Sequence, residues 1–395
     1  MNVAIVTSGI LPLPPVKGGA VENLVKFYLD YNETQNTDIN FTVYSVYDKL
    51  VSNTDLFKYK KTKFAYINTG TFISRVKKLL FRLINRNLYY HHSWEFFISE
   101  VSHKIRNKKF DVVVVENRPG FVFWLSKCTD AKLILHLHND MLNKDTIRAS
   151  EILNLYTKIL TVSKYIKERV DTIMLTDKVQ VAYNGIDLEM FKNPFRPEIT
   201  RKNFNLSEDD FVVVYTGRIE PVKGVKELLK AFSLLFDYKK IKLLIIGGGN
   251  GNKNDGDFFL EMKELASLMP EKVVFAGFQS YEDIPSILNL CDIVIVPSIW
   301  EDPFPTTVLE SLAAGLPLIV TRSGGIPEAV DEKCAIILEI NSELVYSLAE
   351  SILLLYKNVD IRIKMSESAK EESMFFEKDK YALILIDKIR SLFFF

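Results

Sequence analysis

Short, almost continuously apolar runs alternate with helical patterns along the whole chain, and this alternation constrains the fold more than any other feature. Runs of this kind are typical of parallel strands that helices cover on both faces. Six of them lie in the first half of the chain, at 2–7, 39–46, 110–116, 131–138, 158–163 and 178–183. Six more lie in the second half, at 210–217, 242–248, 272–277, 292–298, 317–321 and 335–339. The sequence therefore predicts the α/β class, with two doubly wound, Rossmann-like parallel sheets.

The length of the chain and a break in this alternation predict two domains. A chain of 395 residues is about twice the size of a usual domain. The alternation stops at 193–210, where prolines and a polar run intervene. We expect a first domain at 1–193 and a second domain at 194–375.

Cysteine usage and hydropathy predict a cytoplasmic location. Cys128, Cys291 and Cys334 have neither metal-ligand nor paired spacing, which is typical of a reducing compartment. The sequence shows no signal-peptide pattern and no run of about 20 apolar residues. We therefore expect a cytoplasmic protein that is at most peripheral to a membrane.

The charge is distributed unevenly, although the formal net charge is zero. Residues 1–195 contain 27 Lys and Arg against 19 Asp and Glu, whereas residues 196–395 contain 23 against 31. The basic first half favours an anionic partner or surface.

A segment at 72–97 has the pattern of a basic amphipathic helix. Its apolar side chains fall at helical spacing on one side, and they are Ile73, Val76, Leu79, Leu80, Leu83 and Ile84. The other sides carry Arg75, Lys78, Arg82 and Arg86. Two interpretations stay open: the helix lies on an anionic membrane surface, or its apolar side packs on the core while its basic side is solvated. The terminal SLFFF either adds a membrane contact or packs on the protein.

Parallel sheets bind ligands at the carboxyl ends of their strands, so the loops that follow the strands are candidate sites. After the first strand, Gly18 and Gly19 stand at the mouth of a helix, where they either cradle a phosphate or form a plain flexible loop. In the strand 131–138, His136 and His138 alternate onto the same side, with His138 nearer to the tip. His138 is therefore the histidine nearer to any ligand, unless it is structural.

Two loops of the second half also carry charged residues. Arg218 and Lys223 follow the strand 210–217, and a guanidinium fork with an ammonium group suits a diphosphate, although surface cations are the plain alternative. The glycine-rich segment IIGGGNGNKNDGDFF at 245–259 does not match the dinucleotide fingerprint. Asp255 and Asp257 resemble a metal-binding pair there, but a solvated loop is the more usual setting.

The segment 297–330 holds the most informative acidic pair of the chain. Asp302 falls at the entry of a predicted helix, on the loop that runs into it. Glu310 falls about two turns further along, on the same side. The apolar Trp300 and Phe304 flank them, and idle charges are rarely placed in such surroundings. The following AAGLPLIVT predicts a helix stop and a buried strand. SGGIPE then predicts a glycine-rich turn that opens another helix, with backbone N–H groups that attract an anion.

Together these motifs resemble glycosyltransferase family four, the retaining, nucleotide-sugar-dependent glycosyltransferases of the GT-B fold, over essentially the whole chain. The resemblance is carried by TGRIEPVKG, NGID at 184–187, VVFAGF, DIVIVPS and, above all, WEDPFPTTVLESLAAGLPLIVTRSGGIPE. It implies two Rossmann-like domains that face across a cleft, with acceptor binding in the first and donor binding in the second. It also implies a last helix, at 376–395, that packs back on the first domain.

The resemblance implies roles for the candidate residues as well. Arg218 and Lys223 would bind the donor diphosphate and stabilise the leaving nucleotide, with no metal or other cofactor. Glu310 would hold the ribose hydroxyls, and Asp302 would hold the hydroxyls of the donor sugar. His138 would line the cleft beside the transferred sugar. The remaining residues of the donor site would be Gly18, Gly19, Phe304, Thr306 and Thr307.

Two departures from the family pattern bear on the donor sugar. Asp302 stands where the family has glutamate, and Pro305 stands where glycine is common, so a backbone N–H is missing there. The diphosphate and ribose positions are less affected.

The expected function is therefore the transfer of a hexose-type sugar, with retention, from a nucleotide-diphosphate sugar to a glycan or lipid-linked acceptor. The setting would be the synthesis of a bacterial surface polysaccharide such as lipopolysaccharide, O-antigen or capsule. The expected partners are the donor, the acceptor and, by peripheral contact, an anionic inner membrane surface. No nucleic-acid partner is expected. Two alternatives stay open: a GT-B-type nucleotide-sugar 2-epimerase or phosphorylase, and a non-catalytic partner subunit.

Overall fold

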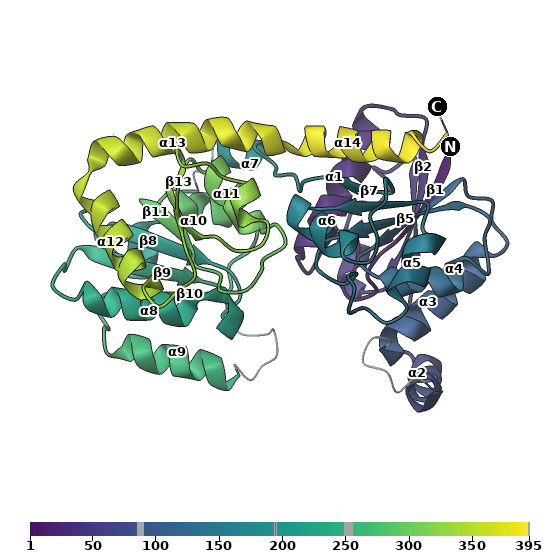
Figure 1. Ribbon diagram of the computed structural model, residues 1–395, viewed down its shortest axis with the longest axis horizontal. Coiled ribbons are helices and arrows are strands. Elements are labelled where there is room, and N and C mark those ends of the chain that lie inside the picture. The colour runs from purple at the N-terminus through teal and green to yellow at the C-terminus, as the bar shows by residue number, and fades with distance from the viewer. Residues whose placement is uncertain (85–90, 193, 195, 249–255, 394–395) are drawn as a thin grey trace. The chain divides into compact units, whose positions relative to one another are not determined.

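The structure, a computed structural model, describes residues 1–84, 91–192, 194, 196–248 and 256–393. The chain divides into two compact units (Figure 1). Unit 1 is Met1–Gly185 together with Lys378–Phe395, and unit 2 is Ile186–Glu377. The division thus falls a few residues before the boundary expected after residue 193. The last segment joins unit 1 from Lys378, whereas the sequence placed this change at 376.

Unit 1 is built on a seven-stranded parallel sheet with the strand order β3-β2-β1-β4-β5-β6-β7. The strands are β1 (Asn2–Val6), β2 (Asn40–Val46), β3 (Thr62–Ile67), β4 (Val112–Glu116), β5 (Lys132–Leu137), β6 (Lys158–Thr161) and β7 (Val179–Val181). Six of these strands were predicted, and β3 was missed. β3 lies at the edge of the sheet and pairs with β2. Its side chains are only partly buried, so it lacks the continuous apolar run of an inner strand.

Helices cover this sheet, and the last helix of the chain belongs to unit 1. The helices are α1 (Ala20–Thr34), α2 (Phe72–Ile84), α3 (His92–Ile105), α4 (Val122–Leu125), α5 (Ala149–Leu155), α6 (Lys164–Asp171) and α14 (Lys378–Arg390). α14 packs against α1, and Tyr381, Leu385 and Ile386 enter the same hydrophobic cluster as β1 and β2. Leu392 of the SLFFF ending is buried in that cluster, whereas residues 394–395 lie outside the described residues.

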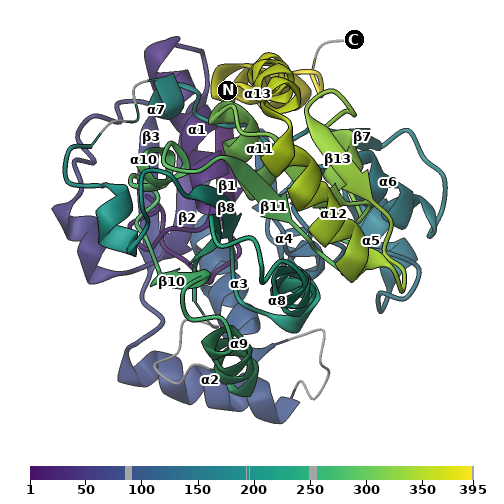
Figure 2. The ribbon, with the colours of Figure 1, turned by 90° about the vertical axis from the view of Figure 1, so that its left-hand side faces the viewer.

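α2 settles one question that the sequence left open. Its apolar side is exposed, so the interpretation in which that side packs on the core is wrong. The side toward α3 carries Ser74, which is buried, and Lys77, which pairs with Glu100 at 2.6 Å. Figure 1 and Figure 2 show α2 beside α3. The side chain of Ile84 and residues 85–90, which include Arg86, lie outside the described residues.

Unit 2 is built on a six-stranded parallel sheet with the order β10-β9-β8-β11-β12-β13. Its strands are β8 (Phe211–Thr216), β9 (Ile241–Ile246), β10 (Val273–Gly277), β11 (Ile293–Val296), β12 (Leu318–Thr321) and β13 (Ala335–Leu338). All six were predicted, so the α/β class with two parallel, Rossmann-like sheets is confirmed.

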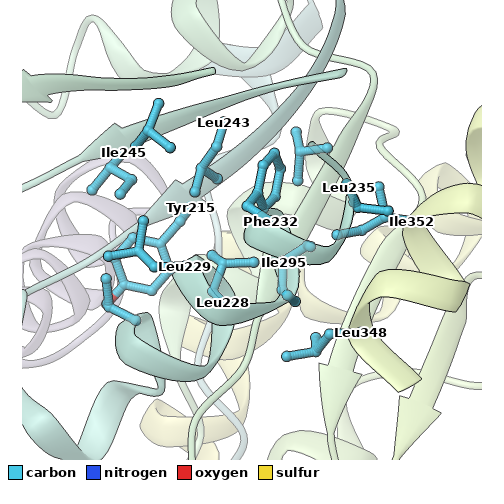
Figure 3. Packing of buried hydrophobic residues seen from close by; sticks show 14 of the residues in the cluster. Tyr215, Leu228, Leu229, Phe232, Leu235, Leu243, Ile245, Ile295, Leu348 and Ile352 are labelled. Atoms are coloured by element: carbon cyan, nitrogen blue, oxygen red, sulfur yellow. The ribbon is translucent and has the colours of Figure 1, made fainter. Parts of the chain in front are cut away.

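The helices of unit 2 cover its sheet. They are α7 (Glu189–Lys192), α8 (Val225–Leu234), α9 (Asp257–Ser267), α10 (Ile284–Leu288), α11 (Thr306–Ala313), α12 (Leu344–Lys357) and α13 (Val359–Ser373). The apolar residues of α8 recur at helical spacing, and this face packs on β9 and α12 (Figure 3). Phe232 and Leu228 are fully buried there, and the burial of each such side chain stabilises the fold by about 1.5–3 kcal/mol.

Because the strands of each sheet are parallel, their carboxyl ends share one edge of that sheet. The loops after β1, β4 and β5 therefore meet at one edge of unit 1, and those after β8, β11 and β12 meet at one edge of unit 2. In the described residues no helix is long and apolar enough to cross a membrane.

Candidate active site

The loop after β8 presents the two predicted cations of unit 2. The hydroxyl of Tyr215 donates a hydrogen bond to the carbonyl oxygen of Arg218 at 2.7 Å, which fixes the start of the loop. The Arg218 side chain is 66% exposed, and its guanidinium pairs with Glu220 at 2.9 Å. Lys223 ends a single 3-10 turn, Pro221–Lys223, directly before α8. Arg218 is thus open to a ligand, whereas Lys223 is more enclosed.

Gly224 allows this loop to lie against the end of β11. Its φ of 71° is in the left-handed region, and a Cβ at this position would lie 1.8 Å from the carbonyl oxygen of Pro297. The N–H of Ile299 donates to the carbonyl oxygen of Val222 at 3.0 Å, which ties the two loops together. Only glycine satisfies both the backbone conformation and the contact.

Asp302 is the acid that meets Lys223. The two side chains form an ion pair, and the Asp302 side chain is only 8% exposed. The N–H of Asp302 donates to Ser323 Oγ at 3.2 Å, and its carbonyl oxygen accepts from the N–H of Gly325 at 2.8 Å. The loops after β8, β11 and β12 therefore converge on Asp302.

Glu310 lies on α11 and is buried. Burial raises its pKa to about 7, against the opposing hydrogen bond from Thr306. Tyr281 lies close enough for its own pKa to be raised by burial and by the charge of Glu310. A carboxyl group with such a pKa changes its charge in the physiological range, which is common at functional sites.

The other predicted residues of the 297–330 segment have more ordinary places. Phe304 is 3% exposed and packs on Phe376, with ring centroids 5.6 Å apart, so its side chain belongs to the core. Thr306 and Thr307 are partly buried in the first turn of α11. The expected helix after SGGIPE is wrong, because only a 3-10 turn, Ile326–Glu328, forms there. A turn of three residues has no dipole comparable to that of a helix.

In unit 1, Gly18 and Gly19 precede α1, as predicted. Both have positive φ values, 71° and 110°. A Cβ at Gly19 would lie 2.2 Å from Glu22 Oε2, so the loop is pressed against that carboxyl group. Glu22 is buried, and burial, with a contribution from Glu116, raises its pKa to about 7. An acid at this position does not favour a phosphate when it is ionised.

His138 lies at the end of β5, and the prediction that His136 and His138 share one side is confirmed. Both rings meet one oxygen of Glu116: His136 Nδ1 lies 3.1 Å from Oε2, and His138 Nε2 lies 2.8 Å from the same atom. Tyr28 donates a hydrogen bond to the other oxygen, Oε1, at 2.9 Å. Glu116, Tyr28 and Glu22 were not singled out in the sequence, although Glu116 ends a predicted strand and the rule of strand ends points to it.

Among the described residues, Glu116, His136 and His138 are the one set whose atoms could hold a metal ion. Histidines that bind metals usually donate their second N–H to a partner. Here His136 Nε2 and His138 Nδ1 are buried and have no hydrogen-bond partner within the described part of the chain. In that part of the chain these two rings therefore lack the second-nitrogen partner that metal-binding histidines usually have. Asp257 opens α9, and Asp255 lies outside the described residues.

Two family models match this chain, one mainly in unit 1 and the other in unit 2. Residues 197–372 match the family described as Glycosyl transferases group 1. Residues 66–190 match the family described as Glycosyltransferase Family 4. Two parallel Rossmann-like sheets with these matches define a glycosyltransferase with the GT-B fold.

Several curated proteins are similar over much of the chain. The putative glycosyltransferase YtcC of Bacillus subtilis is 25% identical over 385 residues, which cover 94% of this chain and 87% of that protein. Spore coat protein SA of the same organism is 26% identical over 345 residues, 84% of each chain. The lipopolysaccharide 1,2-N-acetylglucosaminetransferase of Salmonella typhimurium is 28% identical over 238 residues, 59% of this chain and 60% of that protein.

Solved structures agree on the fold. A glycosyltransferase from Rickettsia africae superposes with a TM-score of 0.77 at 19% identity and covers 99% of this chain and 98% of its own. Anabaena HepE in complex with UDP-glucose superposes with a TM-score of 0.74 at 17% identity, over 99% and 100% of the two chains. The two family matches, at 66–190 and 197–372, show that the chain is a glycosyltransferase.

Proposed function

We propose that this glycosyltransferase moves a hexose-type sugar, with retention of configuration, from a nucleotide-diphosphate sugar to a glycan or lipid-linked acceptor. One observation carries the proposal. The edge of the unit 2 sheet at the ends of β8 and β11 combines two cations, Arg218 and Lys223, with two buried acids, Asp302 and Glu310. β8 and β11 are neighbours in the sheet, so the loop that carries Arg218 and Lys223 and the loop that carries Asp302 follow adjacent strands. Glu310 lies on α11, the helix after the second of these loops.

The chemistry follows from the charges. Arg218 is exposed and offers a fork of donors to the diphosphate, and Lys223 supplies a second positive charge. Negative charge grows on the departing nucleotide, and both cations stabilise it. The acceptor hydroxyl then attacks the oxocarbenium-like sugar from the face that the nucleotide leaves. Asp302 and Glu310 accept hydrogen bonds from hydroxyls of the sugar and of the ribose.

We further propose that the transfer needs no metal ion. A metal in such reactions neutralises the diphosphate, and Arg218 and Lys223 carry two positive charges for that purpose. Neither Asp302 nor Glu310 belongs to the one group of His, Cys, Asp and Glu side chains in the described residues that could hold a metal ion.

The donor and the pathway are inferred from similar proteins. The solved complex of HepE contains UDP-glucose, and one relative is a lipopolysaccharide N-acetylglucosaminetransferase. These similarities favour a nucleotide-sugar donor and a surface polysaccharide such as lipopolysaccharide, O-antigen or capsule.

The exposed side of α2 favours an acceptor held at a membrane. Six large apolar side chains of this helix are 45–80% exposed, and they are Phe72, Ile73, Val76, Leu79, Leu80 and Leu83. α2 also carries Arg75, Lys77, Lys78 and Arg82 and no acidic residue. Apolar side chains with only basic neighbours match an anionic lipid surface. We therefore place the enzyme in the cytoplasm, peripheral to the inner face of an anionic membrane.

Nucleotide release tests the proposed reaction. The purified protein would be incubated with UDP-, GDP- and dTDP-sugars in EDTA, with and without lipid-linked saccharides extracted from bacterial membranes. The proposal predicts release of nucleoside diphosphate from one donor that rises when acceptor is added. Proton NMR of the product should show that the new glycosidic bond has the same anomeric configuration as the donor.

The other outcomes separate the two alternatives. Conversion of the donor without any acceptor would favour the 2-epimerase, and release that depends on phosphate would favour the phosphorylase. Binding of a nucleotide without turnover under any condition would favour the non-catalytic partner subunit. Loss of turnover in EDTA, with recovery on adding a divalent ion, would overturn the metal-independent mechanism.

A further inference from the structure

The carboxyl group of Glu116 joins side chains from three elements of unit 1. Glu116 is the last residue of β4, and the register of the sheet places it opposite His136 of β5. Oε2 lies 3.1 Å from His136 Nδ1 and 2.8 Å from His138 Nε2, and Oε1 accepts a hydrogen bond from the hydroxyl of Tyr28 of α1 at 2.9 Å. Glu116 is 0% exposed, so these contacts take the place of water.

The ionisation of Glu116 fixes where the protons of this cluster lie. Burial alone would raise the pKa of Glu116, but His136 and His138 outweigh it and hold the pKa well below its usual range. An ionised carboxylate has no proton to donate, so each contact must be donated by its partner. The proton of His138 that faces Glu116 is therefore on Nε2.

His138 then has one ring atom left for a ligand. Burial, together with His136, lowers the pKa of His138 to about 4, against the opposing effect of Glu116. At neutral pH the ring carries one proton, on Nε2, and Nδ1 has a free lone pair. Nδ1 is buried and has no hydrogen-bond partner within the described residues. A buried acceptor without a donor is unfavourable, and a ligand hydroxyl would satisfy it.

The backbone around the ring is also held in place. The N–H of His138 donates to Asn117 Oδ1 at 3.1 Å, and the N–H of Asn117 donates to the carbonyl oxygen of His136 at 2.8 Å. Asn117 has a φ of 60°, an uncommon conformation for a residue other than glycine. The ends of β4 and β5 are therefore joined through both backbone and side chains.

We propose that Glu116 is a positioning residue, which locks His138 in the Nε2–H tautomer so that the ring meets a substrate sugar hydroxyl only as a hydrogen-bond acceptor, through Nδ1. His138 then does not act as a proton donor in the reaction. The identity of the hydroxyl rests on the proposed function, whereas the tautomer is a property of the free protein.

Two other roles for this cluster make different predictions. A metal ion held by Glu116, His136 and His138 would remove the protons from both facing nitrogens. A purely structural cluster would affect folding without a specific effect on transfer. The experiment therefore needs a readout of the protons and a readout of turnover.

The tautomer can be measured directly in the protein labelled with ¹⁵N-histidine. The chain has only five histidines, and His138→Gln identifies the signal of His138. Long-range proton–nitrogen spectra distinguish a protonated from an unprotonated ring nitrogen. We expect a protonated Nε2 and an unprotonated Nδ1 from pH 8 to pH 5, and loss of this fixed tautomer in Glu116→Gln.

The matched control is Glu33→Gln. Glu33 also accepts several hydrogen bonds, from the N–H groups of Lys60 and Lys61 and from the hydroxyl of Thr62. These residues lie at the amino end of β3. Glu116 lies at the carboxyl end of β4, on the opposite side of the same sheet. Substitution of Glu33 should leave the His138 spectrum and the transfer rate unchanged.

Kinetics test whether the tautomer matters for transfer. Glu116→Gln should lower kcat by roughly tenfold to a hundredfold, the effect of losing a hydrogen bond to a charged group, and leave binding of the free nucleoside diphosphate unchanged. In the His138→Gln background the same substitution should have no further effect on kcat, because Glu116 acts through that ring.

Three results would overturn the proposal. One is a protonated Nδ1 on His138 in the native protein, or an unchanged tautomer in Glu116→Gln. Another is stoichiometric metal in the purified protein that Glu116→Gln removes. The third is an additive loss of kcat in the double variant. If no nucleotide binds at all, the proposed function fails, while the NMR result still decides the tautomer.

Discussion

Lys223 and Asp302 form an ion pair in unit 2, although 79 residues separate them in the chain. In the sequence these residues were assigned to different parts of the donor, the diphosphate and the sugar. In the structure each is the partner of the other. A diphosphate that binds Lys223 therefore competes with Asp302 and releases that carboxylate for the sugar hydroxyls.

This competition predicts a split effect for Asp302→Asn. The substitution removes the negative charge that neutralises Lys223, so free nucleoside diphosphate should bind as tightly as to the native protein or a few-fold more tightly. Sugar transfer should fall by at least about tenfold, because a charged acceptor for the hydroxyls is lost. Calorimetric titration and a release assay measure the two effects. Equal loss of both would mean that Asp302 serves mainly to position Lys223.

The raised pKa of Glu310 predicts a pH dependence of donor binding. Below about pH 7 the carboxyl group is mostly protonated and is a weaker acceptor for ribose hydroxyls. The Kd for nucleotide should therefore fall between pH 6 and pH 8, by up to about tenfold. Glu310→Gln should bind with a Kd that does not change over this range. A pH dependence that persists in the variant would assign it to another group.

The raised pKa of Glu310 also predicts that stability changes with pH, in the direction opposite to nucleotide binding. The pKa of Glu310 is higher in the folded state than the ordinary glutamate value of 4.5, so its contribution to stability is fully present below pH 4.5 and is lost as the pH rises through about 7. The free energy of unfolding of the native protein should fall relative to Glu310→Gln between pH 5 and pH 8, by as much as about 3 kcal/mol. Urea unfolding at both pH values measures the difference, and a constant difference would contradict the burial of a titrating Glu310.

Gly224 predicts a combined loss of stability and donor binding. Gly224→Ala places a Cβ within 1.8 Å of the carbonyl oxygen of Pro297 and strains a φ of 71°. We expect a loss of about 1–3 kcal/mol of stability and weaker nucleotide binding, because the loop that carries Lys223 must move. Gly256→Ala is the control, since a Cβ there meets nothing within 4 Å. Thermal unfolding with and without nucleotide would show the effect, and an unchanged Gly224→Ala would contradict the close approach.

The exposed side of α2 predicts binding to anionic lipid. The native protein should sediment with vesicles that contain phosphatidylglycerol, and not with pure phosphatidylcholine, and salt should weaken this binding. Leu79→Glu with Leu80→Glu should abolish it. Leu175→Glu is the control, because Leu175 is 81% exposed on the same unit but lies outside α2. A dimer in light scattering that the α2 substitutions dissociate, without vesicle binding, would show that this side holds a second copy of the chain.

The strands that the sequence predicted and the strand that it missed differ in how far their side chains are buried. The inner strands of both sheets are mostly apolar, and Arg218, Lys223, Asp302 and Glu310 lie in the loops after such strands or in the helix that follows. The edge strand β3 was missed because only part of its surface is buried.

Contacts between distant residues left no pattern that one sequence could reveal. The exposed side of α2 has the same periodicity as a core-facing helix, since periodicity shows that a helix has an apolar side and not what covers it. The meeting of Glu116 with Tyr28 and the two histidines depends on three elements coming together. The pairing of Lys223 with Asp302 likewise requires the loops after β8 and β11 to touch.

The most direct test of the central claim, a nucleotide-sugar site at the strand ends of unit 2, is the thermal stabilisation of the purified protein by a panel of UDP-, GDP- and dTDP-sugars in EDTA. A ligand that binds only the folded protein raises Tm by mass action. We predict a rise with the sugars of one nucleotide that Arg218→Ala and Glu310→Ala abolish. Lys240→Ala, at the opposite end of the sheet before β9, should preserve it. No rise with any nucleotide, or a rise that both site variants retain, would contradict the claim.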